Sequence, residues 1–426
     1  MARSSAAGAE TPTKGGRVLA ILLLAYIFNF IDRQIIGVLA VPIKAEFDLS
    51  DQALSYLGIA FALFYSALAI PISWLADRRS RVNIIAISVA VWSGFTAACG
   101  LVNNFAMLVL ARMGVAVGEA GGIAPAYALI SDFYPRERRA RAMAFFSLGI
   151  PIGSALGIFF GGWIASVLDW RSAFIIVGLA GLPVALLVKF GIKDPVRGGY
   201  DSPDGAASEP APPLPIVAAR LARTPSFWLL SFGAASGSIL GYGLIFWLPS
   251  FFNRSFGLAL FDLSLFYGSI VFAGGIAGTW LGGWIGDRMG SANPRAYALI
   301  PAVCFTLAAP CFAFGLFAPS LPVAWILFAI GQMLALAWLG PVISAVQHIV
   351  PPNMRATASA SFLFINNLIG IGVGTWLLGF MSDQMTAAHG ADALQYSILY
   401  GLGFYLLSAA LYFVASTRLK RDWYRG

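Results

Sequence analysis

Four charged side chains occur deep inside apolar stretches of this chain, and they are the groups best suited to chemistry. Asp32 and Arg33 are neighbours in one stretch, and Arg112 and Glu119 lie in another. Ionisable residues within membrane-spanning segments typically bind substrates or relay protons, and they pair with one another. We therefore predict that Asp32 and Glu119 exchange protons. Arg33 and Arg112 would supply positive potential for an anionic headgroup or for the deprotonated carboxylates.

The positions of these charges indicate how they could meet. At 1.5 Å per residue, Asp32 lies roughly 21 Å from the start of its apolar stretch, near the middle of a membrane. Residues seven apart return to nearly the same face of a helix, so Arg112 and Glu119 share a face. Each charge at the centre of a span costs about 2.5–3.5 kcal/mol, so the four must be paired, hydrated or used. A salt-bridge cluster with a purely structural role is the alternative.

Polar residues near the charges complete the candidate binding site. Tyr26 and Asn29 share one face of a helix with Arg33. The second half of the sequence carries no charged residue deep in an apolar stretch. Its polar residues there are Tyr242, Tyr267, Gln332, Asn366 and Asn367, and the last two are our candidates for substrate binding. A cavity with charges on one wall and apolar residues on the other suits an amphiphile, with its headgroup on the first half and its tail on the second.

The composition is that of a membrane protein. The chain has 426 residues, of which 59% are hydrophobic and 11% charged, and its mean hydropathy is +0.80. Such values are far from those of soluble enzymes. With 2 His, three cysteines in apolar stretches and no P-loop or dinucleotide fingerprint, the sequence predicts no metal site, no cofactor and no ATP-driven step. The net charge of +8 is spread over short gaps between apolar stretches, so it indicates topology rather than nucleic-acid binding.

Twelve apolar stretches are long enough to cross a membrane, which requires about 20 residues each. The predicted spans are 18–43, 52–76, 82–102, 104–130, 140–166, 171–190, 226–252, 261–286, 295–317, 320–347, 355–382 and 394–417.

The distribution of Lys and Arg supports this number of spans. With a cytoplasmic N-terminus, 22 of the 27 positive residues fall on the cytoplasmic side. Lys44, Arg171 and Arg254 fall on the opposite side, and Arg33 and Arg112 lie within spans. Because cytoplasmic loops are enriched in Lys and Arg, both termini are predicted to be cytoplasmic, in a plasma membrane or a bacterial inner membrane.

A polar segment divides the spans into six and six. It covers 191–225 and contains seven prolines. We predict an N-terminal six-helix bundle at 1–190, a cytoplasmic linker at 191–225 and a C-terminal six-helix bundle at 226–426. Within the linker, 216–223 fits either a short amphipathic helix on the membrane surface or ordinary linker.

An internal repeat relates the two halves. The run Ser73-Trp-Leu-Ala-Asp77-Arg78 is echoed 210 residues later by Gly283-Trp-Ile-Gly-Asp287-Arg288. Each run follows the second span of its half. The predicted fold is therefore an all-α membrane protein, with twelve transmembrane helices in two pseudo-symmetric six-helix bundles.

The repeated run resembles the loop signature of the major facilitator superfamily, roughly Gly-x-Leu-x-Asp-Arg-x-Gly-Arg. Here it reads from Ser73 to Arg81, with Ser at both glycine positions. The resemblance implies a conformational gate in which Asp77, Arg78 and Arg81 lock the cytoplasmic faces of the halves together. Asp77 would meet the positive N-terminal end of the eleventh span. The second copy adds Asp287 and Arg288 to this gate. Charges that only set the topology are the alternative.

Within that superfamily, the membrane charges resemble those of the Spinster family of lysolipid and sphingosine-1-phosphate transporters. The matching runs are Asn29-Phe-Ile-Asp32-Arg33, Arg112 with Gly118-Glu119-Ala120, and Gly149-Ile-Pro151-Ile-Gly153 with Gly157. The Asn-x-x-Asp-Arg and Gly-Glu-Ala elements also occur in organic-anion symporters of the superfamily.

These resemblances imply a secondary active transporter and not an enzyme. The expected cargo is an anionic, lipid-like amphiphile of the lysophospholipid or sphingosine-1-phosphate type, moved by alternating access with proton coupling. A proton-coupled symporter of small organic anions is the alternative, and a membrane enzyme or scaffold is a further class. Expected partners are the substrate, protons and membrane lipids, without nucleic acid, and the chain is expected to be a monomer.

The charge distribution makes a testable prediction about topology. Single cysteines placed in the 191–225 linker and near Asp383 should be labelled by an impermeant maleimide from opposite sides of the membrane. Labelling of both positions from one side would exclude the arrangement of six spans plus six.

Overall fold

The computed structural model describes residues 12–76, 78–195, 212–290 and 293–424. These residues form helices and contain no strand. The helices of the first half are α1 (Pro12–Phe47), α2 (Asp51–Ala76), α3 (Arg81–Cys99), α4 (Phe105–Glu119), α5 (Ile123–Phe133), α6 (Arg136–Ser147), α7 (Gly149–Val167) and α8 (Trp170–Gly191). The linker contains α9 (Leu214–Ala222). The second half consists of α10 (Pro225–Phe256), α11 (Leu260–Gly290), α12 (Ala296–Leu316), α13 (Leu321–Leu336), α14 (Leu339–His348), α15 (Arg355–His389), α16 (Ala393–Gly401) and α17 (Gly403–Asp422).

The described residues contain eleven stretches that are long and apolar enough to cross a membrane. The last stretch, Thr357–Asp422, covers 66 residues and includes α15, α16 and α17. A 3₁₀ turn at Gly390–Asp392 separates α15 from α16. Each of the twelve predicted spans therefore corresponds to one helix or to a pair of consecutive helices, and the predicted all-α membrane fold is confirmed.

Four spans are interrupted by glycine or proline, which the span prediction did not resolve. The break that matters most lies between α4 and α5, directly after Glu119. There the backbone amides of Gly121 and Gly122 donate to carbonyls only three residues back. Pro125 follows in the first turn of α5 and has no amide to donate. The break thus places Glu119 at the end of a helix, in the interior of the first half.

Side chains rather than sequence hydrophobicity set the starts of several helices. The Ser80 hydroxyl, the Asn104 amide oxygen and the Asp169 carboxylate accept from backbone amides in the first turns of α3, α4 and α8. Asp169 lies between two spans, and the amide of Ser172 donates to it at 2.6 Å. This hydrogen bond holds the pKa of Asp169 below its usual value.

Helix α9 confirms the amphipathic helix considered for the linker. Val217 and Leu221 are buried, and the helix packs against α10 and α15. Leu214 is exposed, and so are the two arginines Arg220 and Arg223. Whether this helix lies on a membrane surface stays a prediction.

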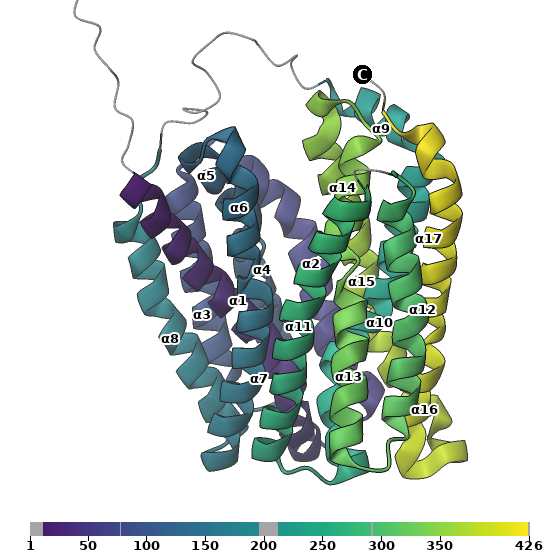
Figure 1. Cartoon of the computed structure of the whole chain (residues 1–426). Coiled ribbons are helices and arrows are strands. Elements are labelled where there is room, and N and C mark those ends of the chain that lie inside the picture. Colours follow the sequence, from purple (N-terminus) through teal and green to yellow (C-terminus); the bar gives the residue numbers. More distant parts are fainter. Residues whose placement is uncertain (1–11, 77, 196–211, 291–292, 425–426) are drawn as a thin grey trace, which may run out of the picture.

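Helices α1 to α8 and helices α10 to α17 form two groups that stand side by side (Figure 1). Among the described residues, the most extensive contacts between the groups are those of α1 with α10, α2 with α15 and α7 with α11. We call the end of the molecule that carries α9 the linker end, at the top of Figure 1, and the other the opposite end. Helix α1 ends and α2 begins at the opposite end. The proposed boundaries 1–190, 191–225 and 226–426 stay predictions.

Close helix approaches depend on glycine. A Cβ atom on Gly58 of α2 would lie 2.7 Å from the Thr375 side chain of α15. A Cβ atom on Gly278 of α11 would lie 2.2 Å from the Met333 carbonyl of α13. Small residues let helices associate in membranes because backbones can come into direct contact.

The α11–α13 contact predicts the effect of adding one methyl group. Gly278→Ala should destabilise the fold by about 1–3 kcal/mol, because the methyl group meets backbone rather than a side chain that can rotate away. Gly94→Ala is the matched control, since nothing lies within 4 Å of a Cβ atom there. Thermal unfolding in detergent should show a lower Tm for the first variant only. Equal Tm values for the two would contradict the tight packing.

Candidate functional site

The centre of the site is an ion pair between α1 and α4. The Nε atom of Arg33 donates to the Oε2 atom of Glu119 at 2.6 Å. Glu119 is completely buried, and the Arg33 side chain is 12% exposed. The pair joins residues 86 positions apart in the sequence. Glu119 thus pairs with an arginine of another helix, although Arg112 shares its own helix.

The other two membrane charges lie beside this pair. Asp32 and Arg112 are both buried, and the Nη1 atom of Arg112 donates to the backbone carbonyl of Asp32 at 3.4 Å. The Asp32 carboxylate lies within electrostatic reach of Glu119 and Arg112. The structure therefore brings Asp32, Arg33, Arg112 and Glu119 into one cluster, as the sequence predicts.

Aromatic rings surround the arginines of this cluster. The Arg33 guanidinium lies 4.6 Å from the ring centre of Tyr65 and 5.3 Å from those of Phe30 and Phe61. The Arg112 guanidinium lies 5.2 Å from the same Phe61 ring. Distances below about 6 Å are favourable for cation–π attraction. Sequence reasoning missed Phe61 and Tyr65, because α2 carries no charge near them. Apolar periodicity also does not distinguish an aromatic ring that only packs against its neighbours from one that lines a binding site.

Several polar atoms of the cluster are buried and have no hydrogen-bond partner among the described residues. A buried polar group without a partner costs about 1–3 kcal/mol. Such a cost is recovered when a substrate, water or a proton satisfies the group. The atoms are both amide atoms of Asn29, Oδ1 of Asp32, Nη2 of Arg33, Nε of Arg112 and Oε1 of Glu119.

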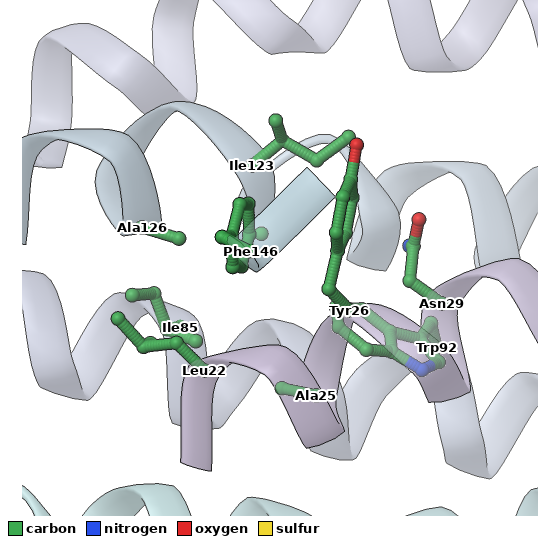
Figure 2. Close-up of a pocket in the computed structure, with 10 residues that line it drawn as sticks. Leu22, Ala25, Tyr26, Asn29, Ile85, Trp92, Ile123, Ala126 and Phe146 are labelled. Carbon is green, nitrogen blue, oxygen red and sulfur yellow. The ribbon is translucent and has the colours of Figure 1, made fainter. Parts of the chain in front are cut away.

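Tyr26 and Asn29 project from α1 into a small pocket within the first half (Figure 2). Its volume of about 10 Å³ is close to that needed for one water molecule. Trp92 and Phe146 also line it. The Tyr26 ring stacks on Phe146 with centres 4.3 Å apart, so packing holds this tyrosine in place.

The predicted polar residues of the second half lie in a separate contact. Asn366 accepts from the Ser238 hydroxyl at 2.8 Å and donates to Asn367 at 3.3 Å. The bond from Ser238 joins α10 to α15, and the bond between the two asparagines lies within α15. Another residue of α10, Tyr242, lies within electrostatic reach of Arg33. The second half thus reaches the cluster through Tyr242, and substrate binding by Asn366 and Asn367 stays a prediction.

The residues predicted to form a conformational gate at the linker end are described in part. Asp77 lies outside the described residues. Arg78 stacks on Trp74 at 3.8 Å, and Arg81 forms an ion pair with Asp132 of α5. In the second copy, Arg288 lies 5.5 Å from the Trp284 ring, and Asp287 lies near Tyr297. These contacts lie within one half each, and the gate role stays a prediction.

A second charged network joins the halves at the opposite end, and sequence reasoning missed it. Asp51 at the start of α2 accepts from Lys44 of α1, from Arg254 of α10 at 2.6 and 2.7 Å, and from Ser382 of α15 at 2.7 Å. Asp383 accepts from the backbone amides of Asp51 and Gln52 at 3.0 and 2.8 Å.

One signal of this network was present in the sequence. Lys44 and Arg254 are two of only three positive residues assigned to that side of the membrane. Their scarcity there marked them as candidates for a specific role. Asp51, the carboxylate that binds both of them, lies at the end of a span. A charged residue is ordinary there, so the sequence did not mark Asp51 as part of a network.

Comparison with known proteins identifies the fold family. The sequence profile of the Major Facilitator Superfamily matches residues 22–375. The chain belongs to this superfamily. Protein spinster homolog 3 of Danio rerio is 30% identical over 431 residues, which cover 95% of this chain and 86% of the relative. Within the superfamily, the chain is a transporter of the Spinster family.

Other relatives agree with this assignment. An MFS-type efflux pump of Mycolicibacterium smegmatis is 30% identical over 420 residues, covering 96% of this chain and 95% of the pump. A solved bacterial homologue of the human lysosomal transporter Spinster, described as inward-facing and unoccupied, superposes with a TM-score of 0.88. It is 31% identical, and the match covers 98% of this chain and all of that one. The occupied inward-facing form gives a TM-score of 0.84.

Membership in this family sets the class of activity. Both the superfamily and the Spinster family consist of transporters rather than enzymes. The protein is a multi-pass membrane transporter. The identities of its substrate and of any coupling ion are finer questions, which depend on the charged cluster.

The opposite-end network predicts how a single carboxylate affects conformation. Asp51→Asn should shift the equilibrium toward separation of the halves at that end by about tenfold, or about 1.4 kcal/mol. The reason is that the asparagine has no negative charge to attract Lys44 and Arg254. Glu46→Gln is the control, since Glu46 pairs with Arg171 at the same end but within the first half. Spin labels at Ala45 and Ser255 would report the distance between α1 and α10. An unchanged distance distribution in the Asp51 variant would show that the Asp51 network does not hold the halves together at this end.

Proposed function

We propose that this transporter moves an anionic, single-chain amphiphile of the lysophospholipid or sphingosine-1-phosphate type by alternating access, coupled to protons. The observation that carries the proposal is the buried pair of Arg33 with Glu119, which has Arg112 and Asp32 beside it. When Asp32 is protonated, the two arginines carry one more positive charge than Glu119 neutralises. A phosphate group satisfies that excess, because arginine donates to phosphate oxygens in a planar, bidentate fashion.

Proton coupling follows from competition for Arg33. When Glu119 is ionised, it holds the Nε atom of Arg33 at 2.6 Å. When Glu119 takes up a proton, its attraction for the guanidinium falls, and Arg33 becomes available to an anion. The Nη2 atom of Arg33 already lacks a partner among the described residues. Asp32 is the second proton acceptor in this scheme, because it shares the electrostatic field of Glu119 and Arg112.

The apolar part of the substrate is assigned to the second half. Tyr242 is near Arg33, whereas Asn366 and Asn367 bond to each other and to Ser238. A wall with few free polar groups suits an acyl chain better than a sugar or a peptide. Tyr26 and Asn29 beside the charges, and Asn366 and Asn367 in the second half, remain our proposed substrate-binding residues.

We further propose that the linker end faces the cytoplasm, with both termini cytoplasmic in a plasma or bacterial inner membrane. The inward-facing state of the solved relatives then fits the contacts of this chain. The Asp51 network, which closes the opposite end, supports that state. The gate of Asp77, Arg78, Arg81, Asp287 and Arg288 would close the linker end in the alternate state. The transporter is proposed to act as a monomer surrounded by membrane lipids.

The decisive test is transport by purified protein in liposomes under an imposed pH gradient. Glu119→Gln should abolish the dependence of transport on the gradient while keeping binding of a single-chain lysophosphatidate, because the amide preserves shape but cannot release a proton. Asp32→Asn should behave in the same way if the two carboxylates share a proton, and more mildly if Asp32 only orients Arg33. Arg112→Ala should weaken lysophosphatidate binding.

A control variant tests the origin of the pH response, and the choice of ligand separates the two substrate classes. Asp169→Asn changes a carboxylate at a helix start outside the spans and should leave the pH response unchanged. An unaltered pH response of Glu119→Gln would show that Glu119 is structural and would overturn the proposed proton coupling, leaving facilitated movement of the lysolipid as the surviving form. Uptake of a small carboxylate in preference to lysophosphatidate would support the alternative, a symporter of small organic anions.

A further inference from the structure

Phe61 of α2 is shared by the two arginines of the site. Its ring centre lies 5.3 Å from the guanidinium of Arg33 and 5.2 Å from that of Arg112. The ring is 5% exposed. Arg33 comes from α1 and Arg112 from α4, so this single ring connects groups from three helices.

The chemistry of the ring suits this position. Two guanidinium groups that lie near one another in a low dielectric repel each other, and both must be compensated. A carboxylate compensates a cation by forming an ion pair, which occupies the donors that an anionic substrate needs. The face of an aromatic ring attracts a cation through its quadrupole and forms no hydrogen bond with it. Phe61 can therefore hold both arginines while leaving their donors free.

Two free donors are consistent with this role. The Nη2 atom of Arg33 and the Nε atom of Arg112 are buried and have no partner among the described residues. The carboxylates that face the arginines are Glu119 and Asp32, and the neighbouring phenols are Tyr65 and, from α10, Tyr242. Among the described residues of this cluster, Glu119 is the carboxylate that forms an ion pair, and its partner is Arg33.

The position of Phe61 is set by the contact between the halves. Gly58 and Ala62 of α2 lie against Thr375 and Gly372 of α15. Phe61 stacks with Tyr65, with ring centres 5.7 Å apart and planes 12° apart, on the side of the charged cluster. One face of α2 therefore packs on the second half while another holds the arginines.

We propose that Phe61 is a positioning residue that holds Arg33 and Arg112 together as a two-arginine site for the anionic group of the substrate. The proposal rests on the proposed function, because it assumes that an anion binds to these arginines. It assigns to α2 a role in substrate selection that none of the charged residues reveals. It also predicts that the role depends on the π system of the ring and not on its volume.

The test compares Phe61→Leu with Phe61→Tyr. Leucine keeps an apolar side chain but removes the ring, and tyrosine keeps the ring. Purified full-length protein is titrated with lysophosphatidate, with the uncharged monoacylglycerol of the same chain length, and with a small dicarboxylate. We expect Phe61→Leu to bind the anions about tenfold more weakly, the equivalent of about 1.4 kcal/mol. Monoacylglycerol binding should change by less than about twofold, and Phe61→Tyr should restore anion binding.

A matched control lies on the same helix. Phe64 is 39% exposed, and Phe64→Leu should bind all three ligands as the wild type does. If Phe61→Leu does not fold, which its Tm would reveal, Phe61→Met provides a second ring-free variant with a more adaptable side chain.

The outcomes distinguish the two proposals. Equal anion binding by the wild type and Phe61→Leu would overturn the role of Phe61 alone. Equal weakening for the anions and for monoacylglycerol would do the same, because it would indicate general loss of packing. Failure of the wild type to bind any of the anions would overturn the proposed function, and the role of Phe61 with it.

Discussion

The buried ion pair between a carboxylate and a guanidinium is the interaction that fixes how the helices of the site lie relative to one another. Arg33 and Glu119 lie 2.6 Å apart, and removal of either would leave the other without its direct ion-pair partner in a low dielectric. The pair therefore requires α1 and α4 to stay in register. The pair can separate only if Glu119 takes up a proton or if another charged group replaces the lost partner. A transporter that alternates between two states can use such a pair as a switch, because the same geometry stabilises one state and resists the other.

The rest of the first half supports this pair. Helix α4 ends at Glu119, and the glycines that follow let the chain bend before α5 begins. Phe61 and Tyr65 of α2 surround Arg33 from another side. Because α2 also packs on α15 through Gly58, the charged cluster and the contact between the halves share one helix. Helix α2 therefore contacts both the arginines of the site and the second half.

The two ends of the molecule have different interactions. At the opposite end, Asp51 joins α1, α2, α10 and α15 through hydrogen bonds to side chains of both halves. At the linker end, Arg78 and Arg81 engage Trp74 and Asp132 within the first half. Among the described residues, the Asp51 network thus links the two halves at the opposite end.

The sequence by itself determined the membrane class, the number of apolar segments, the superfamily and the four charges of the site. Composition and span length are set by the bilayer, and a charge such as Glu119 within an apolar run is visible without any fold. Only the tertiary structure decided that Glu119 pairs with Arg33 rather than Arg112, and that Phe61 touches both arginines. It alone revealed the Asp51 network. The physical reason is that pairing depends on which helices are neighbours and on how they are rotated, and these follow from packing of small residues between helices far apart in the chain.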